Sequence, residues 1–501
     1  CAPPFRPAIH QAMPVTCEEM KIAEEAAFAR GVQAEDLMEQ AGRGIAEIVR
    51  QFHRVPGHCS VFCGKGHNAG DGLVAARYLV CWGWSIDLRF SYPEATLSPL
   101  TAKKLAELPE SGDRSRTQGP KVVLDGLLGI GARGEPREAI AESIRSLNRM
   151  RRDEGAWVLA IDIPSGLDGD TGVPASACVE ADLTATVACV KTGLTTDSAT
   201  NAVGRLALVE LDELRPPEAG PWRIATANTL RAWLPARPFD LHKGDCGRVG
   251  IIAGSPGFTG AARLCSAAAM HAGAGLVTVL AREDATASLT ISCIPEVMVK
   301  RVPSYRDVHD LRFDTLAIGP GLGLEHTAEV LSVVREAPQP MVVDADALNA
   351  ISRDVHLLKH CAGPRLLTPH PGEMERLYPQ RGRTRQKWLE DFLEEYPVTL
   401  LLKGARTIVG NAQDRRFINT TGNPGMASGG MGDVLTGVCA ALAPQMREKD
   451  LFQSACLGAW LCGRSAEISV FEQLGSPEFL CASSVIDNLG AAFASLRAGE
   501  Y

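Results

Sequence analysis

The sequence predicts an α/β protein with two domains, each built on a mostly parallel, doubly wound sheet. Short apolar runs that end in glycine-rich turns alternate with helical stretches along most of the chain, which is typical of parallel sheets covered by helices. The chain has 501 residues, enough for about two to four domains. A charged, proline-rich segment over 212–223 interrupts the alternation. We therefore expect one domain over 1–222 and a second over 223–501.

The elements of the first domain follow from the spacing of its apolar residues. A region over 14–53 carries apolar residues at helical spacing. The strand-like runs after it are CSVFCGKG (59–66), KVVLDGLLGIG (121–131), WVLAIDIPSG (157–166), ATVACV (185–190) and RLALVEL (205–211). Helices are expected between these runs, at GLVAARYLVCWG and REAIAESIRSLNRM.

The second domain resumes the same alternation and ends in helices, which include DVLTGVCAALA and LFQSACLGAWLCGRSAEIS. Its strand-like runs are RVGIIAGS, GLVTVLA, TLAIGPG, MVVDADAL, RLLTPHPGE, VTLLLKGA and RTIVGN. Open α/β sheets bind ligands at the carboxyl ends of their strands. We therefore expect its glycine-rich turns to meet in one crevice, at 254–261, 319–323, 368–373, 402–407 and 423–437.

Composition excludes several classes of partner. The net charge is −8 and the sequence pI about 5.8, which disfavours nucleic acid or an anionic membrane. No run of apolar residues is long enough for a membrane span. The 15 cysteines include no C-x-x-C pair, so we expect buried thiols in a reducing compartment, the cytoplasm.

The stretch NPGMASGGMGDVLTG (423–437) runs from glycines directly into Asp433 and an apolar helix. Glycines let the backbone approach a ligand, and a helix N-terminus offers N–H groups to an anion. Asp433 could then accept a proton from a hydroxyl that attacks a phosphate, although an aspartate here could also be only an N-cap. Lys403 follows a strand and could meet the same phosphate. A Walker A motif is absent.

Polar side chains also follow the strands of the first domain. They are Asn68, Asp71, Asp125, Asp162 and Ser165. Their oxygens could bind a cation or a polar ligand, and each taken singly could be a turn residue. GIGARG (129–134) formally matches G-x-G-x-x-G, but a lone match does not indicate a dinucleotide fingerprint.

The motifs of the second domain resemble the ADP/ATP-dependent NAD(P)H-hydrate dehydratase family, of ribokinase-like fold. The match covers about 225–501 and rests on HKGDCGRVGIIAGSPGFTGAARLC, GPGLG, VVDADALNAI, LTPHPGEMERL, LLKGART and GNPGMASGGMGDVLTG. The resemblance implies that the nucleotide phosphorylates the ring hydroxyl of S-configured NADH or NADPH hydrate, and that loss of phosphate restores the dihydropyridine. Asp433 would be the catalytic base.

The resemblance also implies the contacts of each ligand. The residues expected to touch the hydrate are Ala261, Gly321, His370 and Asp433. Those expected to touch ADP or ATP are Lys403, Gly404, Ala405, Arg406, Thr407 and Gly432. Mg²⁺ is expected from the phosphate chemistry, and its candidate ligands are Asp344, Asp346 and Glu373, which could equally be turn or helix-cap residues.

LMEQAG (37–42), GKGHNAGDG, DGLLGIG and DIPSGLDGDTG resemble the NAD(P)H-hydrate epimerase family, Rossmann-like with three layers. This match covers about 10–215 and implies interconversion of the R and S hydrates with bound K⁺. The K⁺ positions are Asn68, Asp125 and Ser165. The hydrate-binding positions are His67, Asn68, Ala69, Gly70, Asp71, Gly129, Ile130, Gly131, Ala132, Arg133, Gly134, Glu135 and Asp162.

Asp162 is then the expected catalytic carboxylate, because epimerisation requires proton movement. Two positions depart from the family's pattern. His67 replaces an amide, and Ala69 replaces a glycine, which would be unfavourable if that position required a positive φ.

Together the two resemblances predict a bifunctional enzyme for repair of NAD(P)H hydrates, a homo-oligomer without nucleic-acid or membrane partners. One alternative is a ribokinase-like small-molecule kinase that releases a stable phosphorylated product. The other is a non-catalytic binding module in place of the epimerase.

Overall fold

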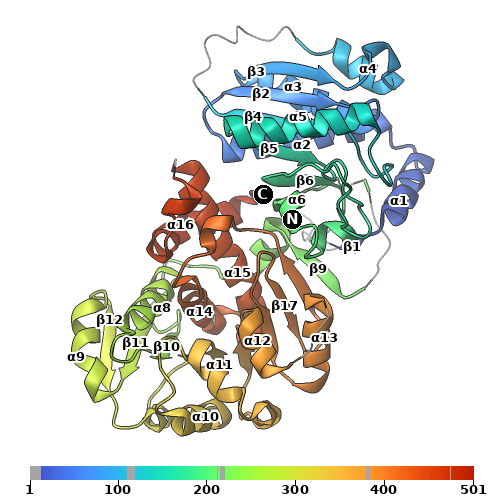
Figure 1. The fold of residues 1–501 in the computed structure, drawn as a ribbon. Coiled ribbons are helices and arrows are strands. Elements are labelled where there is room, and N and C mark those ends of the chain that lie inside the picture. The colour runs from blue at the N-terminus through green and yellow to red at the C-terminus, as the bar shows by residue number, and fades with distance from the viewer. Residues whose placement is uncertain (1–12, 110–118, 212, 215–219, 380–383, 474) are drawn as a thin grey trace. The chain divides into compact units, whose positions relative to one another are not determined.

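The computed structural model describes residues 13–501 except 110–118, 212, 215–219, 380–383 and 474. The chain divides into two compact units, Cys1–Thr229 with Glu500–Tyr501, and Leu230–Gly499. Figure 1 shows both. In the described part of the chain, no helix has the length and apolar character needed to cross a membrane.

Unit 1 contains a six-stranded sheet in the order β3-β2-β4-β5-β6-β8, with parallel pairing throughout. The strands are β2 His58–Cys63, β3 Ser85–Phe90, β4 Lys121–Gly126, β5 Trp157–Ile161, β6 Leu183–Val187 and β8 Arg205–Val209. A separate parallel pair joins β1 Pro14–Val15 to β7 Val190–Lys191, and β9 spans Trp222–Ala225. The helices are α1 Cys17–Ala29, α2 Ala34–Phe52, α3 His67–Cys81, α4 Pro99–Ala106, α5 Glu138–Glu154, α6 Thr200–Val203 and α7 Ala227–Leu230.

This sheet is covered on both faces. Residues that alternate along β2, β4 and β5 point to opposite sides. Phe62, Val123 and Val158 pack with Ile144 of α5 on one side. On the other side a Cβ at Gly72 of α3 would lie 3.1 Å from Val61 and 3.3 Å from Ile161, so α3 and its neighbour α2 form the third layer (Figure 1).

Unit 2 has strands in the order β12-β11-β10-β13-β14-β15-β16-β17-β18, parallel from β12 to β16 and antiparallel beyond. The strands are β10 Arg248–Ile252, β11 Leu276–Ala281, β12 Val297–Arg301, β13 Thr315–Ile318, β14 Met341–Val343, β15 Arg365–Leu367, β16 Thr399–Leu402, β17 Ile408–Asn411 and β18 Arg416–Asn419. The helices are α8 Thr259–His271, α9 Glu283–Ser292, α10 Thr327–Glu336, α11 Ala345–Ile351, α12 Pro371–Leu377, α13 Arg385–Glu395, α14 Met431–Leu442, α15 Leu451–Glu467 and α16 Ala482–Ala498.

Strand order identifies where each unit can bind a ligand. In unit 1, β3 and β4 lie on opposite sides of β2, so the direction of strand order reverses at β2. In unit 2, β11 and β13 lie on opposite sides of β10, and the order reverses there in the same way. In open α/β sheets, ligands bind at the carboxyl ends of the strands beside such a reversal. The expected α/β class with parallel sheets is confirmed.

Candidate active sites

A cavity of about 800 Å³ lies in unit 1 beside the carboxyl ends of β2, β4 and β5. The structure brings most of the expected hydrate-binding residues to its wall, namely His67, Asn68, Asp71, Gly129, Ile130, Gly131, Ala132, Arg133, Gly134, Glu135 and Asp162. Ala69 and Gly70 do not line it, because both are buried within α3. The volume suits a drug-sized or larger ligand.

The segment His67–Asp71 differs from the loop that its glycines suggest. It forms the first five residues of α3, which begins at His67. Ala69 has a helical backbone and its φ is not positive. An alanine is therefore accommodated here without strain. A Cβ at Gly70 would lie 2.5 Å from Met38 of α2 and 3.3 Å from Thr101 of α4. Close helix packing therefore explains the glycine at this position.

The three expected K⁺ positions lie in one hydrogen-bonded group. Ser165 Oγ donates to Asp125 Oδ1 at 2.7 Å, and the N–H of Leu128 donates to Ser165 Oγ at 3.0 Å. Asn68 Nδ2 donates to the carbonyls of Leu128 at 2.6 Å and Ile161 at 3.1 Å. Burial raises the pKa of Asp125 to about 6, against the hydrogen bonds from Ser165 and Leu127.

These groups fit an alkali cation. Two backbone carbonyls converge on the Asn68 amide, and a hydroxyl and a buried carboxylate lie beside them. All are hard oxygen ligands. A cation at this point would replace the two amide hydrogen bonds, and rotation of Asn68 would present its oxygen instead.

Asp162 stands at the end of β5 in a left-handed conformation, with φ of 66°. Aspartate tolerates this region better than most residues, and such strain is concentrated at functional sites. Its Oδ1 forms an ion pair with Lys191 Nζ and accepts the N–H of Val187 at 3.2 Å. Lys191 also lines the cavity. Our sequence reasoning missed this lysine, although it directly follows the strand-like run 185–190.

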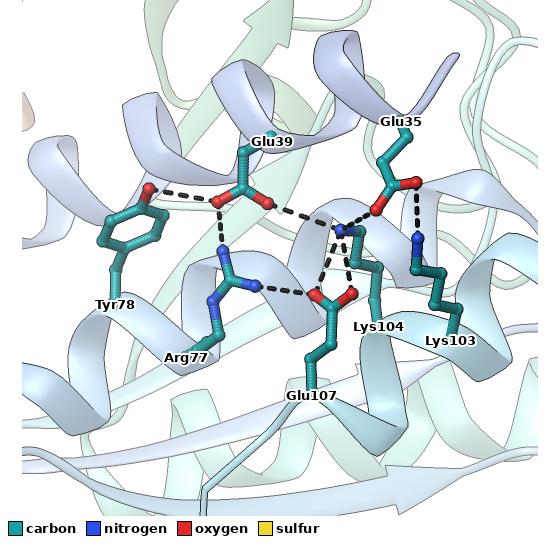
Figure 2. Close-up of polar contacts among 7 residues, drawn as sticks. All are labelled: Glu35, Glu39, Arg77, Tyr78, Lys103, Lys104 and Glu107. Carbon is teal, nitrogen blue, oxygen red and sulfur yellow. Dashed lines mark hydrogen bonds and ion pairs between the residues drawn. The ribbon is translucent and has the colours of Figure 1, made fainter. Parts of the chain in front are cut away.

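A polar network holds α4 against α2 and α3 (Figure 2). Lys104 Nζ lies 2.7 Å from Glu35, 3.0 Å from Glu107 and 3.6 Å from Glu39. Arg77 pairs with Glu107 at 2.7 Å. The same helix supports the cavity wall, because Thr101 Oγ1 donates to the carbonyl of Gly66 at 3.0 Å. The network therefore fixes the segment that precedes His67.

In unit 2, Asp433 lies in the first turn of α14. Gly430 is the N-cap, with φ of 90°, so the capping role considered for Asp433 is excluded. Burial raises the pKa of Asp433 to about 6; the negative charges of Asp344 and Asp346 raise it further, and Lys403 opposes them. The carboxylate is thus poised to take a proton near neutral pH.

Lys403 links the neighbouring strand ends. Its Nζ lies 2.9 Å from Asp344 Oδ1 and 3.8 Å from Glu373 Oε2. Asp344 Oδ2 accepts a hydrogen bond of 2.8 Å from Thr436 Oγ1. A Cβ at Gly432 would lie 3.2 Å from Lys403 Nζ. The absence of a side chain at Gly432 thus lets the first turn of α14 approach Lys403. Gly432 and Lys403, both expected to contact the nucleotide, are therefore neighbours.

Two of the expected hydrate contacts in unit 2 are also neighbours. A Cβ at Gly321, where φ is 57°, would lie 2.9 Å from the Cβ of Ala261. His370 is the N-cap of α12; its Nδ1 accepts the N–H groups of Gly372 at 3.0 Å and Glu373 at 3.3 Å. This arrangement leaves His370 Nε2 to donate, and it lies 3.6 Å from Glu373 Oε1.

The turn after β16 divides into exposed and buried positions. Gly404 and Ala405 are exposed, and Thr407 is half-buried. Arg406 has only 4% of its surface exposed, and its carbonyl accepts Arg385 Nη1 at 2.9 Å. The backbone at 404–405 is thus more accessible to a ligand than the Arg406 side chain.

The Mg²⁺ candidates differ in the oxygens that they have free. Both oxygens of Asp344 are used, by Lys403 and Thr436. Asp346 Oδ2 accepts the N–H of Gly323 at 2.8 Å and its Oδ1 accepts Asn349 Nδ2 at 3.4 Å. Glu373 Oε2 accepts the N–H of His370 at 2.8 Å. Among the described residues no group of three or more His, Cys, Asp or Glu could hold a metal ion. A Mg²⁺ ion here would therefore depend on phosphate oxygens and water as well as Asp346 or Glu373.

Comparison with known proteins matches each unit separately. Residues 249–477 match the NAD(P)H-hydrate dehydratase family, and residues 34–193 match the YjeF-related protein N-terminus. A bifunctional NAD(P)H-hydrate repair enzyme of Moorella thermoacetica is 37% identical and covers 86% of this chain and 87% of its own. One from Escherichia coli is 35% identical, with 89% and 87% covered.

An ADP/ATP-dependent NAD(P)H-hydrate dehydratase of Bacillus subtilis, solved with ATP and Mg²⁺, is similar to 55% of this chain and 98% of its own, with 27% identity and a TM-score of 0.47. The full-length relatives confirm the expected family and favour it over the kinase alternative.

Proposed function

Because the chain belongs to the family of bifunctional NAD(P)H-hydrate repair enzymes, we propose that unit 1 epimerises the R and S hydrates of NADH and NADPH. Unit 2 dehydrates the S form with ADP or ATP. The observation that carries the proposal is the full-length similarity to these relatives. It is supported by the lysine–aspartate pair at the strand ends of each unit.

In unit 2 the proposed base is Asp433. Its carboxylate takes the proton of the ring hydroxyl, and the hydroxyl oxygen attacks the terminal phosphorus, which releases AMP or ADP. Lys403 neutralises charge on the phosphate, and the N–H groups at the start of α14 bind it. The C–O bond then breaks, phosphate leaves, and loss of a proton from the neighbouring carbon restores the ring double bond. Mg²⁺ would supply charge neutralisation at the phosphates.

In unit 1 the proposed site is the cavity around Asp162, with the glycine-rich turn 129–135 against the dinucleotide. K⁺ would lie among Asn68, Asp125 and Ser165, where it would neutralise the buried carboxylate and order the turn that follows β4. The cytoplasm and a homo-oligomer remain our expectations for location and assembly.

The test is recovery of NADH absorbance from a mixture of R and S NADH hydrate with Mg²⁺, K⁺ and either ADP or ATP. Recovery from both epimers, faster than spontaneous interconversion, is the expected result, and the two nucleotides would be compared directly. Recovery that stops when the S epimer is exhausted would contradict the epimerase assignment. Nucleotide consumption without NADH recovery would contradict the dehydratase assignment.

A further inference from the structure

The environment of Lys191 suggests a function beyond packing. It lies on β7, opposite Val15 of β1, and its side chain is 1% exposed. Among the described residues, its ammonium group contacts Asp162, the carbonyl of Val187 at 2.9 Å and Thr186 Oγ1 at 3.4 Å. A buried ammonium is unfavourable without such partners. These groups therefore stabilise the charge of Lys191 beside Asp162.

The ion pair engages only one oxygen of Asp162. Lys191, Val187 N–H and Thr186 Oγ1 all contact Oδ1. None of the described residues donates to Oδ2, and Asp162 lines the cavity. Lys191 therefore fixes the carboxylate while one oxygen remains accessible to a ligand.

A second carboxyl group, Asp71, lines the same cavity from the N-terminal part of α3. Within the described part of the chain its carboxyl group makes no hydrogen bond. Burial raises its pKa well above the usual range, and the negative charges of Asp162 and Glu24 add to this, against Lys191. Burial also raises the pKa of Glu24. Burial also raises the pKa values of the nearby thiols of Cys17 and Cys189, to about 12 and about 11. The other ionisable side chains of the cavity wall are those of Lys65, His67, Tyr92, Arg133, Glu135 and Arg137.

We propose that Lys191 and Asp71 complete the epimerisation site: Lys191 is a positioning residue that holds Asp162 as the base, and Asp71 is the catalytic acid in the same cavity. This inference rests on the proposed epimerase function of unit 1. One carboxyl group that gives a proton and a second that takes one are a common arrangement for acid–base catalysis.

The chemistry follows from the hydrate itself. Its hydroxyl is on a ring carbon bonded to the ring nitrogen. Asp71 gives its proton to the hydroxyl oxygen, the C–O bond breaks with its electron pair on the oxygen, and water leaves. The nitrogen lone pair forms a C=N bond. Water then adds to the opposite face, the C=N pair returns to nitrogen, and Asp162 takes the proton of the added water. Solvent returns a proton from Asp162 to Asp71, so no redox partner is needed.

The experiment measures conversion of S to R NADH hydrate by the full chain without nucleotide, by chromatography, at a series of pH values. Asp71→Asn should lower kcat about a hundredfold or more and remove the loss of rate at high pH. Lys191→Met should lower kcat with little change in KM, because Asp162 loses the partner that holds its carboxylate in place. Lys191→Arg should restore part of kcat.

Lys121→Met is the matched control, because it removes a lysine from an ion pair with Glu154 that lies outside the cavity wall. A thermal melt of each variant separates unfolding from catalysis. Wild-type rates in Asp71→Asn would overturn the acid assignment. An unchanged kcat in Lys191→Met, or Lys191→Arg no better than Lys191→Met, would reduce Lys191 to a structural residue. Absence of epimerisation in the wild type would instead reject the epimerase function itself.

Discussion

Both units place a lysine beside an aspartate at a strand end, Lys191 with 1% and Lys403 with 20% of its side chain exposed, but they use it differently. In unit 1, Lys191 pairs with Asp162, the proposed base itself. In unit 2, Lys403 pairs with Asp344, and the proposed base Asp433 keeps a pKa raised to about 6. In unit 1 the lysine therefore orients the base directly, whereas in unit 2 the lysine is held by another residue and the base exchanges protons near neutral pH.

The sharpest way to break this comparison is Asp433→Asn. We expect dehydration of S NADH hydrate to fall about 10³-fold, because the hydroxyl loses its proton acceptor. Epimerisation should be unchanged, since it belongs to unit 1. The thermal midpoint should not fall, because burial disfavours the charged carboxylate of Asp433. Asp310→Asn, an exposed aspartate of the same unit, is the control; an active Asp433→Asn enzyme would refute the role.

Lys403→Met tests how far the unit 2 lysine acts on the base. We expect about a hundredfold loss of dehydration, because the phosphate charge is no longer neutralised. In the wild type, the rate should fall as pH decreases through about 6, where Asp433 becomes protonated. Lys403 lowers that pKa, so its removal should move the loss of rate to higher pH. Lys359→Met, from a surface pair with Glu395, should leave the profile unchanged, and an unmoved profile in Lys403→Met would contradict the coupling.

Removal of K⁺ tests whether the cation acts on unit 1 alone. Replacing K⁺ with tetramethylammonium at constant ionic strength should lower epimerisation about tenfold, because the carbonyls and the Asp125 group lose their cation. Dehydration of S hydrate should not respond. Asp125→Asn should lose most of the K⁺ response, and an equal effect on both activities would indicate a cation site elsewhere.

The smallest effect is expected from Lys104→Met in the network of Figure 2. The Lys104 side chain is 4% exposed and lies near three glutamates. Lys103 is 56% exposed and, among the described residues, pairs with Glu35 alone. Lys104→Met should lower the stability of unit 1 by about 1 kcal/mol, or about 3 °C in a thermal melt. Lys103→Met should have no measurable effect, and equal effects of the two would mean that burial does not matter here.

Much of each site was predictable from the sequence, because glycine-rich turns after apolar runs identify the carboxyl ends of strands. Asp162, Asp433 and Lys403 were predicted as site residues in this way. Lys191 was missed because its significance depends on Asp162, which lies far from it in the sequence. The same position rule that identified Lys403 would have identified it.

The sequence alone determined the α/β class and the family, since these depend on periodicity and on motifs in a fixed order. Tertiary structure alone decided which charges meet. It made His67–Asp71 the start of a helix instead of a loop, because Gly70 packs against Met38 and Thr101. It also excluded Asp433 as an N-cap and paired Lys191 with Asp162. Burial and distance set these electrostatic relations, and neither is encoded locally.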